Sequence, residues 1–379
     1  MHVAIVSYPL PAHVPGPHAL IERFYALRDW AEALAAAGAR VTVVQRFYDD
    51  TAMQIGSVRY QFVRDGRRQL PRTWHIPRRL HRAVAAVGPD VAHLQGQIFP
   101  LQARALRAAL PPRVALVVQH HAGDPPAPHG LRGAAHLALA RLGLAAADGF
   151  LFTSTELARP WRAAGIIRPH QPVYPVLEAS TTLRAPARVP VRLTGEPALL
   201  WVGRLHPVKD PLTVLEGLAR ALPQLPGARL TMIYGSEELL GAVQRRIAQP
   251  DLAGRVALLG RLPQCQLPDY YAAADLFVLG SHREGGGFAL IEALACGLPP
   301  VITDIPAFRA VTGGAVGAHW PPGDAEACAR AIVAVARRNL DREREAARDR
   351  FERVLSWEAV GRAAYAAYAD LVRRVCASP

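Results

Sequence analysis

The chain has 379 residues, of which 51% are hydrophobic, and it carries a formal net charge of +13. This length exceeds the usual limit of a single hydrophobic core, and the apolar fraction excludes a disordered chain. No apolar run reaches the ~20 residues that a membrane-spanning helix needs. The first residues lack a basic leader and are typical of a strand rather than a signal peptide. The four cysteines form no C-x-x-C pair, which excludes a zinc knuckle or a disulfide framework.

The positive charge is concentrated in the first half of the chain. Residues 1–178 contain 20 arginines and 11 acidic residues, whereas residues 179–356 contain 21 cations and 18 acidic residues. All 44 cations except Lys209 are arginine. A basic half of this kind can meet phosphates, an anionic lipid surface or nucleic acid.

In the first half, short β-branched and apolar runs alternate with helical patterns. A helix is predicted over residues 20–34, with apolar residues on one face and Gly38 as its C-terminal cap. The strand–helix–strand repeat predicts a parallel, doubly wound sheet. Buried strands are predicted at residues 3–7, 41–44, 91–94, 114–118 and 150–153.

The second half repeats this pattern, with strands predicted at residues 199–202, 230–234, 256–259, 276–279 and 301–303. The chain is therefore expected to form an N-terminal domain over residues 1–183, a Pro- and Arg-rich linker over 184–197, and a second domain over 198–356. A final helix over residues 357–379, capped by Ser356, is expected to pack back toward the first domain. Two such α/β domains predict ligand binding in an interdomain cleft, beyond the carboxyl ends of the strands.

The strongest local motif is SHREGGGFALIEALACGLPPVITD, at residues 281–304. Glu284 and Glu292 are separated by three glycines and by a helix predicted to begin near Phe288. The glycines allow the backbone to approach a ligand closely, and the first amides of the helix point toward an anion. Taken alone, the motif has an alternative interpretation as a Gly-rich helix entry with two solvated glutamates.

A second motif, WVGRLHPVKDP, occupies residues 201–211. Arg204 and Lys209 follow a predicted strand in the loop that opens the next helix. Two cations at this position can hold a diphosphate and neutralise the charge that it gains on leaving. An ordinary basic loop is the alternative in a chain so rich in arginine.

Together these motifs resemble the retaining glycosyltransferases of family 4, which have the GT-B fold. The resemblance extends to most of the chain and includes the segments PDVAHLQG, VVQHHAG, YYAAADLFVLGS and FERVLSWEAV. The Glu-x(7)-Glu spacing, followed by ALACGLPPVITD, is its most specific part.

The resemblance implies roles for individual residues in binding a nucleotide-sugar donor. Arg204 and Lys209 would hold the diphosphate, Glu284 the hydroxyls of the donor sugar, and Glu292 the ribose. The remaining donor-binding positions implied are the amides of Gly286, Gly287 and Phe288, together with Leu262.

A histidine after the strand at residues 114–118 would face the sugar from the first domain. His121 is favoured, because its HA dipeptide matches the family pattern better, and His120 is the alternative. The resemblance also implies metal-independent transfer with retention, and the sequence contains no Asp-x-Asp pair. A UDP-sugar is the expected donor and GDP-mannose the second choice, with a glycan, a lipid-linked sugar or a small metabolite as hydroxyl acceptor.

Other functions stay open at this point. One alternative is a non-catalytic nucleotide-sugar binder, and another is a sugar-nucleotide epimerase or phosphorylase of the same fold. Residues 64–82, from Arg64 to Arg82, contain seven arginines around Trp74 and suggest peripheral contact with anionic lipid. A solvated basic face is the favoured interpretation, because prolines interrupt any long amphipathic helix. No nucleic-acid reader motif is present, so a cytoplasmic enzyme, peripheral to the membrane at most, is predicted.

Overall fold

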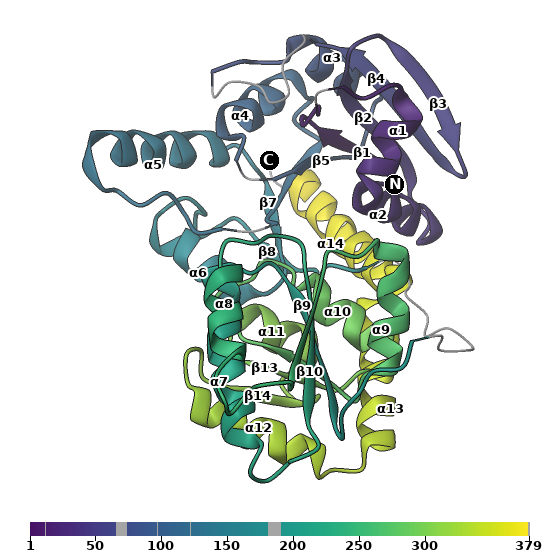
Figure 1. Cartoon of the computed structure of the whole chain (residues 1–379). Coiled ribbons are helices and arrows are strands. Elements are labelled where there is room, and N and C mark those ends of the chain that lie inside the picture. The colour runs from purple at the N-terminus through teal and green to yellow at the C-terminus, as the bar shows by residue number, and fades with distance from the viewer. Residues whose placement is uncertain (12, 66–73, 97, 122, 181–190, 378–379) are drawn as a thin grey trace. The chain divides into compact units, whose positions relative to one another are not determined.

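The computed structural model describes the chain except for residues 12, 66–73, 97, 122, 181–190 and 378–379 (Figure 1). It divides into two compact domains. The N-terminal domain consists of Met1–Leu177 and the terminal segment from Trp357, and the C-terminal domain consists of Glu178–Ser356. The division falls a few residues before the linker predicted at 184–197, and residues 184–190 of that linker lie outside the described residues.

The N-terminal domain is built on an eight-stranded sheet with the order β3-β4-β2-β1-β5-β6-β7-β8. All neighbouring strands are parallel except β3 and β4, which form an antiparallel hairpin. The five strands predicted for this half are confirmed, and β3, β4 and β8 are additional. The strands are β1 (His2–Ser7), β2 (Arg40–Phe47), β3 (Thr51–Ile55), β4 (Val58–Arg64), β5 (Val91–Gln95), β6 (Ala115–Gln119), β7 (Gly149–Phe152) and β8 (Val173–Pro175).

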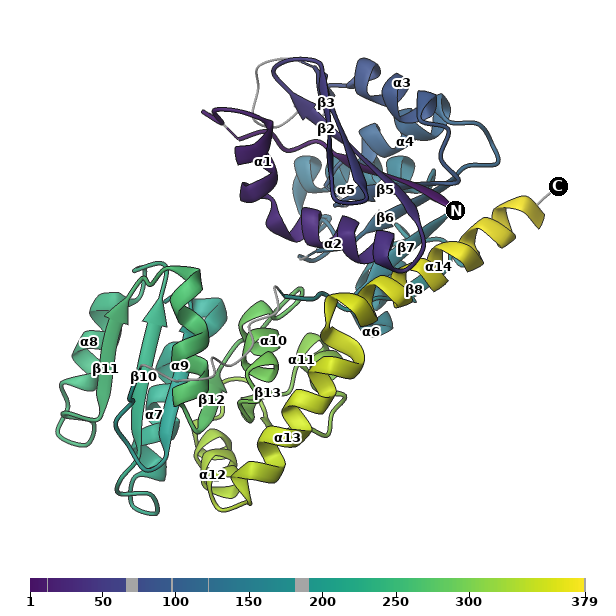
Figure 2. The same ribbon diagram turned by 90° about the vertical axis from the view of Figure 1, so that its right-hand side faces the viewer.

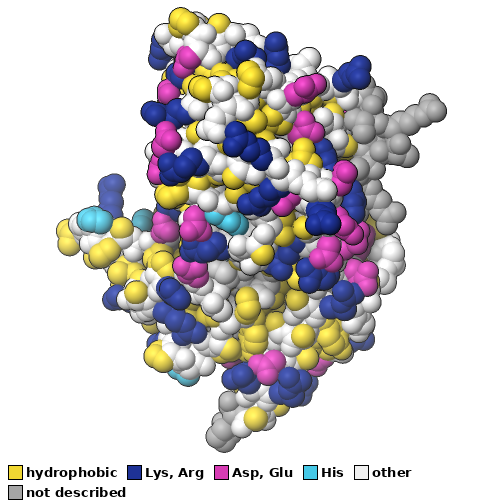
Figure 3. Space-filling model, turned by 90° about the horizontal axis from the view of Figure 1, so that it is seen from below, with side chains coloured by type: hydrophobic (Ala, Val, Ile, Leu, Met, Phe, Trp, Pro, Cys, Tyr) yellow, Lys and Arg dark blue, Asp and Glu magenta, His cyan; other side chains and the backbone are white. Residues whose placement is uncertain are grey.

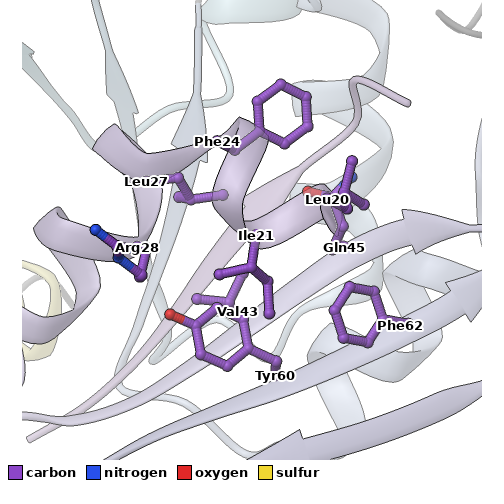
Figure 4. A pocket seen from close by; sticks show the side chains of 9 residues that line it. All are labelled: Leu20, Ile21, Phe24, Leu27, Arg28, Val43, Gln45, Tyr60 and Phe62. Atoms are coloured by element: carbon purple, nitrogen blue, oxygen red, sulfur yellow. The ribbon is translucent and has the colours of Figure 1, made fainter. Parts of the chain in front are cut away.

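Helices cover both faces of this sheet (Figures 1 and 2). On one face, the prediction of a single helix over residues 20–34 is wrong. Two helices occupy this stretch, because the backbone leaves the helical region at Phe24 (ψ 46°). The two helices on either side of this break, with β2 and β4, line an apolar cavity of only about 10 Å³ (Figure 4). The helices are α1 (Pro17–Arg23), α2 (Tyr25–Ala36), α3 (Arg78–Ala86), α4 (Pro100–Ala109), α5 (Gly130–Leu144) and α6 (Thr155–Ala163).

The last helix, α14 (Trp357–Ala377), completes the N-terminal domain by packing against α2. The backbones approach closely where Gly361 faces Ala33, since a Cβ on this glycine would lie 2.4 Å from the Ala33 carbonyl oxygen. The Tyr368 hydroxyl also bonds to Nδ1 of His93 at 2.9 Å. Burial lowers the pKa of His93 to about 3, so the ring is neutral at pH 7.

The C-terminal domain has a six-stranded parallel sheet with the order β11-β10-β9-β12-β13-β14. Its five predicted strands are confirmed, and the short edge strand β14 is additional. In sequence, the sheet grows from β9 outward through β10 and β11, and then continues on the other side of β9 with β12. The strands are β9 (Ala198–Gly203), β10 (Arg229–Tyr234), β11 (Val256–Gly260), β12 (Leu276–Leu279), β13 (Pro300–Thr303) and β14 (Ala318–Trp320).

Helices cover both faces of this second sheet as well (Figure 2). One layer contains α7, α8 and α12, and the other contains α9, α10, α11 and α13. The helices are α7 (Pro211–Ala221), α8 (Leu240–Ile247), α9 (Leu267–Ala273), α10 (Phe288–Ala295), α11 (Pro306–Thr312), α12 (Ala325–Ala336) and α13 (Leu340–Arg350).

The surface has no continuous patch of one charge on the face drawn in Figure 3, where Lys and Arg side chains alternate with Asp and Glu. Of the basic segment at residues 64–82, residues 66–73 lie outside the described residues. Trp74 is 69% exposed, and α3 begins only at Arg78. Within the described residues, no helix is both long enough and apolar enough to cross a bilayer.

Candidate active site

Both predicted motifs of the C-terminal domain lie in loops that leave neighbouring strands. The motif at residues 201–211 follows β9 and that at residues 281–304 follows β12, and these strands pair directly at Leu276↔Leu199 and Phe277↔Leu200 (Figure 1). Because the sheet reverses its order of growth between β9 and β12, the two loops diverge at the topological switch point. In open α/β sheets, ligands bind in the crevice at this point.

Hydrogen bonds hold the two loops side by side. The amide of His282 donates to the carbonyl of Val208 at 2.8 Å, and the His282 ring bonds through Nε2 to Asp210 Oδ2 at 2.8 Å. Asp210 also caps α7, since its carboxylate accepts from the amide of Thr213 at 3.2 Å. One aspartate therefore fixes the beginning of a helix and the loop that carries the second motif.

The structure brings Lys209 and Glu284 together in an ion pair between the lysine Nζ and the carboxylate Oε1. The side chains are only 16% and 12% exposed, so the pair is largely shielded from water. The Ser281 hydroxyl donates a second bond to the same carboxylate oxygen at 2.7 Å. A diphosphate that binds Lys209 must therefore share its ammonium group with a carboxylate that is already in contact, or displace that carboxylate.

Arg204, the second predicted cation, is exposed directly after β9. Within the described part of the chain it forms no ion pair, so its guanidinium can reach an incoming anion without losing a protein partner.

The glycines before α10 have the geometry that close approach of the backbone requires. Gly287 is the N-cap residue, in a left-handed conformation (φ 73°), and a Cβ there would lie 3.2 Å from the ring of Phe308. A Cβ on Gly286 would lie 2.7 Å from Cγ of Glu178. The first hydrogen bonds within α10 begin at the amide of Leu290, so the amide of Phe288 precedes them. The predicted beginning of this helix is confirmed.

Glu292 lies one turn inside α10 and is buried. Its carboxylate accepts hydrogen bonds from the Tyr271 hydroxyl at 3.0 Å, from Ser180 Oγ at 3.4 Å and from Gln264 Nε2 at 3.4 Å. Burial raises the pKa of Glu292, and these hydrogen bonds oppose that rise. Leu262 is partly buried in the loop after β11 that also supplies Gln264.

The N-terminal domain distinguishes its two candidate histidines. His121 is exposed, and its Nε2 bonds to Oε1 of Gln95, at the carboxyl end of β5, at 2.8 Å. His120 is buried and stacks on Phe152, with ring centroids 4.4 Å apart and an angle of 12° between the planes. The role of either histidine stays a prediction, but only His121 presents its ring to solvent.

Several residues that hold the site in place were missed from the sequence. Asp210 was detectable, because an aspartate directly before a proline that opens a helix is an N-cap pattern. Tyr271 and Gln95 carry no such local signal, because each acts through a residue that only the fold brings near. Ser281 lies three positions before Glu284 in the same motif, but the bond between them depends on how the loop folds.

Among the described residues, no group of three or more His, Cys, Asp or Glu side chains is placed to hold a metal ion. Metal independence stays a prediction for experiment.

Two family profiles match consecutive parts of the chain. The profile of Glycosyltransferase Family 4 matches residues 25–174, and that of Glycosyl transferases group 1 matches residues 187–350. They meet near the observed division between the domains and together span most of the chain.

Curated relatives match over shorter stretches. A mannosylfructose-phosphate synthase from Agrobacterium fabrum is 35% identical over 34% of this chain and 30% of its own length. A D-inositol 3-phosphate glycosyltransferase from Segniliparus rotundus is 29% identical over 52% of this chain and 45% of its own length. The chain thus spans less than half the length of these relatives.

Solved structures match over the whole chain. A sucrose-phosphate synthase from Thermosynechococcus elongatus superposes with a TM-score of 0.67 at 22% identity, covering 100% of both chains. An E. coli structure titled as trehalose-6-phosphate bound with UDP-2-fluoro glucose gives a TM-score of 0.67 at 13% identity, covering 98% of this chain and 99% of its own. These likenesses confirm the GT-B fold, and with the two profiles they place the chain in glycosyltransferase family 4.

Proposed function

We propose that this protein is a retaining glycosyltransferase that moves a sugar from a nucleoside diphosphate sugar to a hydroxyl group of an acceptor. The observation that carries the proposal is the contact between Lys209 and Glu284. A cation suited to a diphosphate and a carboxylate suited to sugar hydroxyls come from different loops and meet at the switch point of the sheet. Family membership supports this reading of their chemistry.

The leaving diphosphate gains negative charge as the anomeric C–O bond breaks. Lys209 and the exposed Arg204 would neutralise part of that charge, and the amides of Gly287 and Phe288 at the tip of α10 would donate to phosphate oxygens. Because the amides of α10 are fixed by the fold, they would stabilise the leaving group with little reorganisation. We therefore propose that transfer needs no divalent metal ion.

The two glutamates would hold different parts of the donor. Glu284 lies beside Lys209, so it would bind hydroxyls of the sugar next to the diphosphate. Glu292 is held by Tyr271 and would accept from a ribose hydroxyl with its remaining acceptor capacity. Its buried, hydrogen-bonded position suits a group that orients a ligand rather than one that transfers protons.

His121 would face the sugar from the N-terminal domain. Gln95 Nε2 donates to Gln119 Oε1 at 3.2 Å, which leaves Gln95 Oε1 to accept from Nε2–H of His121. This arrangement fixes the tautomer of the imidazole and orients its ring, so Gln95 acts as a positioning residue.

The proposed donor is a UDP-sugar, with GDP-mannose as the second choice, following the family resemblance. The curated relatives above are named for products or substrates that are phosphates of small sugars or of inositol. A small hydroxylated metabolite is therefore proposed as acceptor ahead of a glycan or a lipid-linked sugar.

The test begins with thermal shifts of the full chain against UDP-, GDP-, ADP- and TDP-sugars. The donor selected is then incubated with candidate acceptors, and the anomeric configuration of the product is determined by NMR. We expect one nucleotide class to stabilise the protein, and turnover with retention that persists in EDTA. Stabilisation without turnover would favour a non-catalytic binder, and loss of turnover in EDTA that a divalent metal restores would refute metal independence.

A further inference from the structure

A polar cavity lies in the N-terminal domain, at the amino ends of β1 and β2. Its volume is about 590 Å³, which is within the range of small-molecule sites. Leu80 and Val84 of α3 pack into the core, and the end of this helix, at Ala86 and Val87, borders the cavity. The residues that line it are His2, Arg40, Val41, Thr42, Gln54, Ser57, Arg59, Gln61, Ala86 and Val87.

The strand register places the polar members of this lining on one face of the sheet. His2 lies opposite Arg40 on the neighbouring strand, and Thr42 lies opposite Arg59. Gln54 of β3 is in turn opposite Arg59. Arg40 and Thr42 are two residues apart, so their side chains point to the same side. The strand spacing then puts the Cα atoms of Arg40 and Arg59 about 8 Å apart, within reach of one anion for two long side chains.

The cavity is positively charged and has no acidic lining residue. Across the described residues, neither Arg40 nor Arg59 forms an ion pair. Arg40 instead donates to Nδ1 of the buried His2 at 2.8 Å, and His2 Nε2 bonds to the Thr42 hydroxyl at 3.0 Å. The nearby carboxylate of Asp90 accepts a hydrogen bond from the backbone amide of His2 at 2.7 Å, and Asp90 does not line the cavity.

The protonation state of His2 allows its ring to hold the guanidinium of Arg40 in place. Burial, and then the charge of Arg40, lower the pKa of His2, so the ring is neutral at pH 7. A neutral ring that donates from Nε2 to Thr42 must accept at Nδ1. Arg40 is thus directed by a partner that does not neutralise its charge.

We propose that this cavity binds the phosphate group of a small polar metabolite, such as a phosphorylated sugar or polyol. Arg40 and Arg59 would hold the phosphate through charge-assisted hydrogen bonds. Gln54, Ser57 and Gln61 offer amide and hydroxyl groups to the hydroxyls of the ligand body. This polar lining favours a soluble phosphate ester over the headgroup of a membrane lipid.

The site is distinct from the proposed reaction centre of the same domain. His2 and Arg40 lie where β1 and β2 begin, whereas His121 follows the carboxyl end of β6 in the same parallel sheet. The two groups therefore lie at opposite ends of the parallel strands. A ligand in this cavity is not the acceptor that faces His121. The proposal goes beyond glycosyl transfer and does not depend on it.

Isothermal titration calorimetry tests the proposal on the full chain saturated with UDP, which occupies the proposed donor site. The probes are inorganic phosphate, glucose 6-phosphate and glucose. We expect saturable binding of both phosphates, tighter for glucose 6-phosphate, and none for glucose. Arg40→Gln with Arg59→Gln should weaken phosphate binding at least about tenfold, because two charge-assisted bonds are lost. Arg104→Gln, an exposed arginine on α4 outside the cavity, should bind as the wild type does.

Unchanged phosphate affinity in the double variant would overturn the proposal, as would the absence of saturable binding to the wild type. Sedimentation with phosphatidic acid vesicles tests whether the phosphate comes from a lipid headgroup instead of a soluble metabolite. Vesicle binding that requires Arg40 and Arg59, without binding of glucose 6-phosphate, would replace the metabolite by a membrane surface and refute the proposal. If the double variant does not fold, the single Arg59→Gln variant serves instead, with an expected loss of about threefold or more.

Discussion

Replacing Glu284 by glutamine tests the contact that carries the proposed function. The substitution preserves shape and removes the negative charge that Lys209 now contacts. Lys209 then faces a neutral amide, so a nucleoside diphosphate no longer competes with a carboxylate for its ammonium group. We expect UDP to bind Glu284→Gln more tightly than it binds the wild type. Transfer should nevertheless fall, because the donor sugar loses its charged acceptor.

The expected magnitudes follow from the environment of the pair. Exposed ion pairs contribute up to about 1 kcal/mol, and this pair is largely shielded, so release of Lys209 should strengthen UDP binding about threefold to tenfold. A hydrogen bond to a charged group contributes about 1.5–3 kcal/mol. Its loss from the transition state corresponds to a fall in kcat of about tenfold to a hundredfold.

Calorimetric titration with UDP and steady-state transfer kinetics measure the two effects separately. Glu326→Gln is a matched control, since Glu326 forms an exposed ion pair with Arg220 at 3.4 Å in the same domain. Both UDP affinity and kcat should stay at wild-type values in this control. A tenfold loss of UDP affinity in Glu284→Gln would refute the reasoning, because Glu284 would then be holding Lys209 in place rather than competing for it. Unchanged transfer would remove Glu284 from the sugar site.

The remaining predictions concern the diphosphate contact of Lys209, the helix cap formed by Asp210 and the buried Glu292. Lys209→Ala should weaken UDP about tenfold or more while leaving uridine affinity nearly unchanged, and equal losses measured by calorimetry would contradict its phosphate role. Asp210→Ala should lower the free energy of unfolding by about 1–2 kcal/mol in urea, whereas Asp210→Asn, which keeps the acceptor for Thr213, should lose less. Burial raises the pKa of Glu292, so the folded chain holds that proton more tightly than the unfolded chain. The free energy of unfolding should therefore fall as pH rises from about 4.5 through the raised pKa, and Glu292→Gln should remove this part of the pH dependence.

Most of the strands that the sequence predicted have both faces buried, and β11, whose residues are half-buried or exposed, is an exception. Strands with both faces buried appear as short apolar runs, as in β1 and β12, where every residue is buried. The hairpin β3–β4 was missed because β3 has mostly exposed residues and β4 alternates between buried and exposed positions at its start. The break at Phe24 was also missed, since apolar periodicity continues across it and nothing local marks the change in ψ.

For the site, the sequence identified the loops but not their contacts. Glycines before a helix and cations after a strand are local patterns, and both lie where they were predicted. The pairing of Lys209 with Glu284, 75 positions away, depends on the adjacency of β9 and β12, which no local pattern encodes. The bond between Tyr271 and the buried Glu292 likewise depends on how α9 packs against α10.

The return of α14 to the N-terminal domain affects the order in which the chain can mature on the ribosome. The stretch Glu178–Ser356 is continuous and can fold as soon as it has emerged. The N-terminal domain begins the chain, yet Trp30 and His93 gain their full cover only when Tyr368 arrives. A fragment cut after Leu177 would expose this aromatic surface and should aggregate. Soluble expression of the isolated domain would need residues 357–377 joined to residues 1–177 in one polypeptide.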